Sequence, residues 1–179
     1  MLDYIISLIF GAVAFVLLLG YQLGMREATT GQVFSSAVQQ DLTSATKTLE
    51  YDFQKMGYGS TDSAKVVQAD TSTIEFKCDV DGDGVVNSVL YYLGDPVPGS
   101  PNSAARILYR QIDVQSPLAI AGGVSRFKLT YFDGAGHPTS VLSQIRSVYV
   151  ALTVESNEGT ENIFPAVCWE STIRPRNLR

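Results

Sequence analysis

The chain has 179 residues, which suits one compact domain of about 100 to 150 residues plus an extension better than two full domains. Its formal net charge is -5 and its Lys and Arg residues are scattered, which excludes the basic face that binds a nucleic-acid backbone. The single histidine, His137, has no nucleophile motif around it, so the sequence predicts no enzyme.

The N-terminal segment is the most hydrophobic part of the chain. Apart from Ser7, residues 4–19 (YIISLIFGAVAFVLLL) are apolar or aromatic, and with their neighbours they reach the roughly 20 residues that cross a bilayer. A buried core helix and a cleavable signal peptide are the alternatives. Core helices are usually shorter, and a signal peptide needs basic residues before the apolar run and a small-residue cleavage site after it. We therefore interpret residues 1–24 as a retained membrane anchor.

Residues 25–57 are predicted to continue this helix in amphipathic form. There is no proline from Met25 to Met56, and apolar residues recur at steps of three or four, which is one face of an α-helix. These residues are Phe34, Val38, Leu42, Ala45, Leu49, Phe53 and Met56. The two parts together form a helix of about 55 residues, or roughly 80 Å. Gly57 and Gly59 are expected to end it.

Residues 58–179 are predicted to form a β-rich head. Ile74, Phe76 and Cys78 alternate with Glu75 and Lys77, as in a strand with one buried face. Segments of strand character are separated by short loops rich in Asp, Gly, Pro, Asn and Ser. They are KVVQAD, STIEFKCDV, SVLYYLG, RILYRQID, SRFKLTYFD and IRSVYVALTV. The expected fold class is α+β, with the long N-terminal helix packed on a mainly antiparallel sheet.

The end of the predicted helix, LEYDFQKMGYGS, carries a family resemblance. Its pattern of Leu-x-x-Asp-hydrophobic-x-x-x-Gly-aromatic-Gly is formed by Leu49, Asp52, Phe53, Gly57, Tyr58 and Gly59. With the apolar N-terminus, the DVDGDG hairpin, the RFKLTYFD and IRSVYVALTV strands and the terminal RPRNL, the chain resembles type IV pilins and the pseudopilins of type II secretion. It is most similar to minor pilins of W type and pseudopilins of J type.

This resemblance implies a structural subunit of a type IV pilus-like extracellular filament, which polymerises through its hydrophobic N-terminal helix. The implied partners are further copies of the chain, the ATP-driven assembly machinery and the inner membrane before assembly. Two alternatives stay open. One is a minor pseudopilin of a type II secretion system, located in the periplasm, and the other is a membrane-anchored calcium-binding domain that does not polymerise.

The N-terminus departs from the family pattern. The resemblance implies a mature chain that begins with Phe or Met, after a basic leader, and carries Glu at its fifth position, whereas the fifth residue is Ile5 and the only early acid is Asp3. If Met1 is the mature N-terminus, Asp3 replaces the Glu by pairing with an N-terminal ammonium of its own or a neighbouring chain, which relieves the cost of a carboxylate in lipid. Alternatively, Asp3 lies unpaired in the headgroup region.

The DVDGDG segment places Asp79, Asp81 and Asp83 two residues apart, as at the start of a calcium-binding loop. The twelfth position of such a loop, where a bidentate acid is expected, is Leu90. A calcium ion would therefore need other ligands, such as Asn87 or the backbone oxygen of Val85. The alternative is a solvated hairpin turn. No other cofactor is predicted.

The two cysteines, Cys78 and Cys168, lack zinc-site spacing. They either form one disulfide, which suits an exported domain and would close a loop of about 90 residues, or remain two buried thiols.

Overall fold

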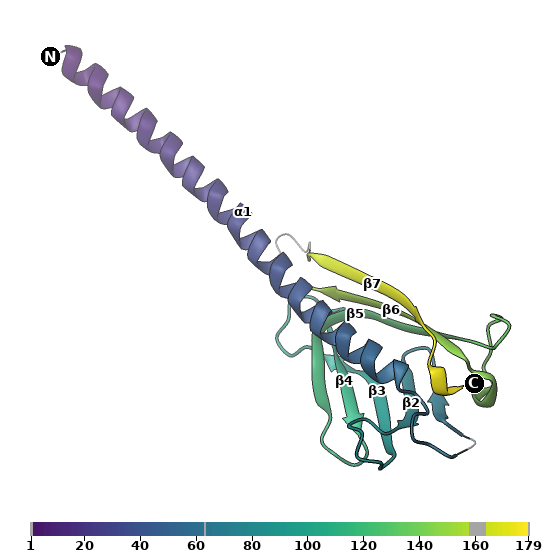
Figure 1. Ribbon diagram of the computed structural model, residues 1–179. Helices are drawn as coiled ribbons and strands as arrows, with labels where there is room; N and C mark the ends of the chain where they lie inside the picture. Colours follow the sequence, from purple (N-terminus) through teal and green to yellow (C-terminus); the bar gives the residue numbers. More distant parts are fainter. Residues whose placement is uncertain (1, 63, 158–163, 179) are drawn as a thin grey trace.

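The computed structural model describes the backbone of residues 2–62, 64–157 and 164–178; along the helix it describes the side chains of residues 10–21 and 38–54. The described residues form one helix and seven strands, which Figure 1 labels where there is room. The helix is α1 (Leu2–Gln54), and the strands are β1 (Val66–Ala69), β2 (Thr73–Cys78), β3 (Asn87–Pro96), β4 (Arg106–Ile112), β5 (Leu118–Phe132), β6 (Ser147–Glu155) and β7 (Ala166–Ile173). Two 3-10 turns, η1 (Leu142–Gln144) and η2 (Arg176–Leu178), follow β5 and β7.

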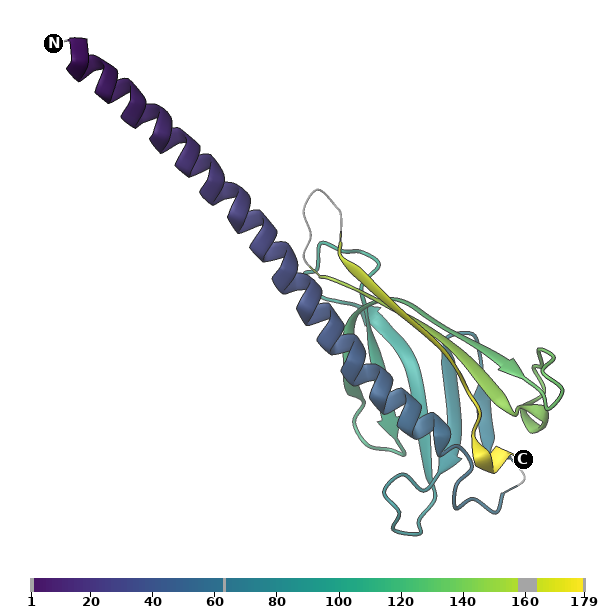
Figure 2. The same ribbon diagram turned by 45° about the horizontal axis from the view of Figure 1, so that its top comes forward.

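The strands form a single antiparallel sheet in which each strand pairs with its neighbours in sequence, in the order β1-β2-β3-β4-β5-β6-β7. The sheet curls around the end of α1 (Figures 1 and 2). Strand β5 carries much of this curl, because its first half pairs with β4 and its second half pairs with β6. Gly123 lies at the change-over with φ 70, and a Cβ there would overlap the carbonyl oxygen of Glu155. Only glycine fits this bend.

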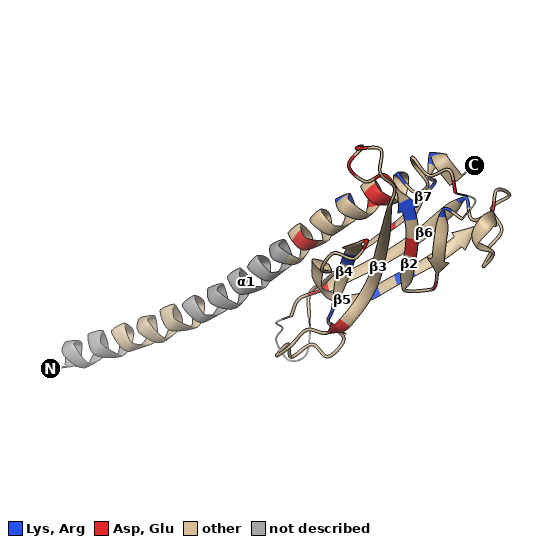
Figure 3. Ribbon diagram, turned by 90° about the horizontal axis from the view of Figure 1, so that it is seen from below, with Lys and Arg blue, Asp and Glu red and all other residues tan. Residues whose placement is uncertain are grey.

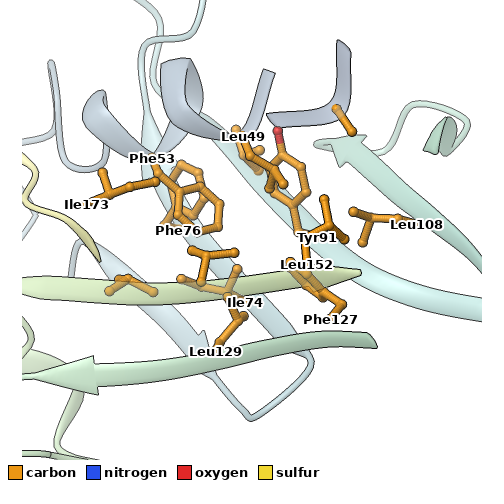
Figure 4. Close-up of a cluster of buried hydrophobic side chains, with 14 of the residues drawn as sticks. Leu49, Phe53, Ile74, Phe76, Tyr91, Leu108, Phe127, Leu129, Leu152 and Ile173 are labelled. Carbon is orange, nitrogen blue, oxygen red and sulfur yellow. The ribbon is translucent and has the colours of Figure 1, made fainter. Parts of the chain in front are cut away.

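The predicted apolar stripe of the helix covers the concave face of the sheet. Val38, Leu42, Ala45, Leu49, Phe53 and Met56 are all buried, as predicted, whereas the side chain of Phe34 lies outside the described residues. Phe53 lies at the centre of the core (Figure 4), edge-to-face with Phe76 at 5.6 Å and with Tyr91 at 5.5 Å between ring centroids. These contacts attach the helix to β2 and β3.

The helix ends where the sequence predicts. Gly57 and Gly59 have φ 76 and 74, a conformation that favours glycine and that ends helices. The Gly57 N–H donates to the carbonyl oxygen of Lys77 on β2 at 2.8 Å, so the chain passes directly from the helix to the sheet. A Cβ on Gly57 would approach the side chain of Lys65 and the backbone of Asn177. Tight packing, as well as φ, therefore requires glycine at this position.

The expected fold class is wrong. The structure is mostly β, a seven-stranded curled sheet, and the long N-terminal helix is not packed along its length on that sheet. Its described side chains fall into two stretches: residues 38–54 pack on the sheet, whereas residues 10–21 are exposed. The physical reason is size, since a helix of 53 residues is about 80 Å long and a sheet of short strands covers only its last turns.

Across the described part of the chain, there is no helix whose length and apolar character would let it cross a membrane. Much of the predicted anchor, residues 1–24, lies outside the described side chains.

Candidate functional site

The first candidate site is the helical segment that extends beyond the head. Figures 1 and 2 show α1 continuing away from the sheet toward the N-terminus. Every described side chain from Phe10 to Tyr21 is exposed, including Phe10 at 72% and Leu17 at 69%, and none of these residues is charged. Contiguous exposed apolar surface of this extent marks an interaction site. We call residues 10–21 the apolar segment.

A buried ion pair fixes α1 to the sheet. The Asp52 carboxylate, only 1% exposed, accepts hydrogen bonds from Arg110 Nε at 2.6 Å, Arg110 Nη2 at 3.1 Å and the Tyr91 hydroxyl at 2.6 Å. Tyr91 lies on β3 and Arg110 on β4, and Figure 4 shows the Tyr91 ring reaching from the sheet toward the helix. Burial, together with the adjacent Asp52 carboxylate, raises the pKa of Tyr91 well above its ordinary value, so the hydroxyl stays protonated as a donor.

Only one member of this ion pair could be identified from the sequence. Asp52 is part of the LEYDFQKMGYGS motif, but its partners Tyr91 and Arg110 are distant in sequence and were not identified. A signal was present, because Asp52 stands directly beside Phe53 and three residues after Leu49 on the apolar stripe. A carboxylate on a buried helix face requires a buried cation or several donors.

The structure brings together the three aspartates of the loop between β2 and β3, which we call the acidic loop (residues 79–86). Asp79, Asp81 and Asp83 have ligand atoms within 4.8 Å of one another, and Asp79 is buried whereas the other two are exposed. Oxygen ligands of this kind suit calcium. The Asp79 carboxylate, however, already accepts the backbone N–H groups of Gly82 at 2.7 Å and Gly84 at 3.0 Å.

Two positions considered from the sequence do not add a side-chain ligand to the acidic loop. Asn87, the extra ligand considered from the sequence, instead donates its side-chain amide to Asp113 at 2.9 Å. Leu90, at the twelfth position, lies within β3 and pairs with Glu75 and Gln111 of the adjacent strands. The local bonds account for the turn without an ion, and calcium binding stays a prediction.

The cysteines do not form the disulfide considered from the sequence. Both are free thiols: Cys78 is buried at the end of β2, and Cys168 is exposed on the edge strand β7. The alternation that placed Cys78 on the inward face is confirmed. Cys168 differs from both expectations, because Val167 and Trp169 lean against the core and the side chain between them points outward.

The two thiols are expected to differ in reactivity. Burial, with a smaller contribution from the charge of Asp52, raises the pKa of Cys78 to about 12, so little of the reactive thiolate exists near neutral pH. Iodoacetamide at about pH 8 should therefore alkylate Cys168 and spare Cys78 in the folded protein. Peptide mass spectrometry measures both sites, and unfolding in urea should make both react. Equal modification of the folded protein would contradict this burial.

The remaining residues singled out in the sequence lie apart from these sites. His137 is exposed in the loop after β5, as predicted, with Nδ1 3.6 Å from the Asp133 carboxylate. Met1 and the side chain of Asp3 fall outside the described residues, so the charge pairing at the N-terminus stays a prediction. Comparison of the chain with protein-family models, with curated proteins and with solved structures gives no significant match.

Proposed function

We propose that the chain is a structural subunit of a type IV pilus-like filament, which polymerises through its hydrophobic N-terminal helix. The observation that carries this proposal is the apolar segment, a stretch of exposed helix without a charge that extends from the head. Isolated exposed apolar residues are common, but a continuous helical surface of them is unfavourable in water. The same segments of neighbouring copies would supply the missing contacts.

The shape of the molecule supports assembly rather than catalysis. A filament subunit needs one part that packs in the filament core and another that faces outward, and the head and the apolar segment divide the chain in this way (Figure 1). The helix is joined to the head by the ion pair of Asp52 with Arg110 and by the ring contacts of Phe53 with Phe76 and Tyr91. Tension along the helix would therefore be transmitted to the head through buried contacts.

Before assembly, we propose, the apolar segment resides in the inner membrane and the head lies outside the cytoplasm. An apolar helix has similar packing energy in lipid and in a helical bundle, so little free energy separates the two locations once neighbouring helices are present. Directed movement from one to the other requires an ATP-driven assembly machine as partner.

A charge placed in the apolar segment tests the proposal. In cells that contain the assembly machinery, Leu17→Asp should abolish filaments in the sheared surface fraction, because a carboxylate would be buried between helices. Val114→Asp is the matched control: Val114 is 99% exposed on the head, and this variant should assemble normally. Electron microscopy with mass spectrometry of the sheared material identifies the subunit.

Three results separate the functions. Filaments composed mainly of the wild-type chain support the proposal, and their loss only in Leu17→Asp assigns polymerisation to the apolar segment. Finding the wild-type chain exclusively in the membrane fraction would overturn the proposal in favour of an anchored domain. Filaments of Leu17→Asp as abundant as wild type would exclude the apolar segment from the contact.

A further inference from the structure

A groove lies beside the end of α1. Its volume is about 740 Å³, and it is lined on one side by the last turns of α1 and on the other by the end of β7 and the C-terminal segment. Tyr51 and Tyr58 contribute exposed aromatic surface to this groove. The groove therefore combines two aromatic rings with polar and charged side chains and is open to solvent.

The groove is positively charged. Its lining contains three cations, Lys55, Arg174 and Arg176, and one acid, Glu50. Lys55 Nζ donates to the carbonyl oxygen of Val80 at 2.7 Å and lies 4.6 Å from the Tyr51 ring centroid. Arg174 and Arg176 are exposed, and neither has an ion-pair partner within the described residues. Two guanidinium groups are thus available to an incoming anionic segment.

The acidic loop carries the complementary features. Asp81 and Asp83 are exposed, and their only hydrogen bonds in the described structure are accepted from N–H groups of the loop itself. Val85 and Val86 beside them are exposed apolar side chains, Val85 at 58%. The loop thus offers carboxylates and small apolar groups, whereas the groove offers guanidinium groups and aromatic rings.

Loop and groove belong to the same end of the head. Figure 3 shows acidic residues of the loop and basic residues near the C-terminus gathered around the end of α1. The base of the loop is held there, since Lys55 and the Tyr51 hydroxyl both contact the Val80 carbonyl oxygen. Within one molecule, Asp81 and Asp83 form no ion pair with the groove cations in the described structure. The charges of the loop and of the groove are therefore unpaired in the described structure of one copy and accessible from solvent.

We propose that the acidic loop of one copy docks into the basic groove of the next, forming the contact between heads in the filament. This inference rests on the proposed function, because it names the contact that accompanies packing of the apolar segments. A loop and a groove can also pair reciprocally about a two-fold axis, which closes a dimer. Subunits whose apolar segments pack in one filament all point the same way, so the proposed contact is heterologous and continues from copy to copy. A second copy is preferred as occupant because the chain itself supplies the complementary charge.

Charge reversal tests this contact in the full chain, in cells with the assembly machinery. Asp81→Lys with Asp83→Lys reverses the loop, and Arg174→Glu with Arg176→Glu reverses the groove. Each pair should reduce sheared filaments roughly tenfold or more, since like charges then face each other. All four substitutions in one chain should restore assembly. A control with the same change in charge is Asp70→Lys with Asp95→Lys. Asp70 lies in the turn between β1 and β2 and Asp95 near the end of β3; both are exposed and outside the loop and the groove, so this variant should assemble as wild type.

The four-substitution variant separates this contact from calcium binding. It lacks two of the three carboxylates that could hold an ion, so its recovery would attribute the loss in the loop variant to charge pairing. If wild type assembles and the reversed variants assemble equally well, or if combining them restores nothing, the head contact is wrong while the filament function stands. If wild type forms no filament, the proposed function itself fails.

Cross-linking gives the second measurement. In a Cys168→Ser background, which removes the exposed thiol, Asp83→Cys and Arg176→Cys in one chain should give a ladder of disulfide-linked multimers when filaments are oxidised. Either cysteine alone should give far fewer. Products that stop at dimers would indicate a closed two-fold contact, and the absence of cross-links in intact filaments would exclude the docking; both results overturn the proposal.

Discussion

Asp52→Ala is expected to destabilise the head by about 3 to 5 kcal/mol, because it leaves the guanidinium of Arg110 and the hydroxyl of Tyr91 without their shared acceptor in a buried position. Denaturant unfolding of the full chain in detergent, followed by the fluorescence of its single tryptophan, Trp169, measures the change. Trp169 packs against the core from β7 and so reports loss of the sheet.

Two further variants decide whether the Asp52 effect comes from the ion pair. Asp95→Ala removes an exposed carboxylate and should change stability by less than about 0.5 kcal/mol. Asp52→Leu with Arg110→Met replaces both charges by apolar side chains and should recover much of the loss, since no unpaired charge then remains buried. A double variant less stable than Asp52→Ala would show that the helix position depends on the geometry of the ion pair.

Phe53→Ala is expected to cost about 3 to 5 kcal/mol, through lost burial and the cavity left between α1, β2 and β3. Phe53 is fully buried and contacts both Phe76 and Tyr91 edge-to-face, so no neighbour can easily fill its place. The same denaturant experiment measures the loss. Phe10→Ala is the matched control: Phe10 is exposed on the apolar segment, and its truncation should leave the stability of the head unchanged.

Equal stability losses in Phe53→Ala and Phe10→Ala would contradict the separation of the helix into a packed and an exposed stretch. If only Phe53→Ala lowers the stability of the head, and only changes in the apolar segment alter filament formation, then residues 38–54 stabilise the head and residues 10–21 mediate assembly.

Sequence periodicity predicted the local structure of this chain well. The helical stripe from Val38 to Met56 is buried, Gly57 follows the end of the helix, and Ile74, Phe76 and Cys78 point inward from β2. These features depend on neighbours three, four or two residues apart, which is the range that a pattern records.

The errors concern longer distances. An apolar stripe indicates which face of a helix is buried but not how far the sheet extends beneath it. The prediction of a long helix packed on the sheet was therefore wrong. The partners of Asp52 come from β3 and β4, and no spacing rule connects them. Cys168 was expected either in a disulfide or as a buried thiol, but the edge strand β7 exposes alternate residues and Cys168 is one of them.

The packing of α1 against β7 affects how the head folds. Each strand pairs with the preceding one, so the sheet can grow by local steps. Helix α1, however, also contacts β5, β6 and β7, the last strands in the sequence. The helix is synthesised first. Strands β2 and β3 can cover Phe53 early, but the side of the helix that contacts β7 stays uncovered until residue 173 is available. A chain interrupted before β7 would therefore expose part of the stripe and the edge of β6, surfaces that aggregate or attract chaperones and proteases. Protease resistance of the head would therefore require the chain to be complete through β7.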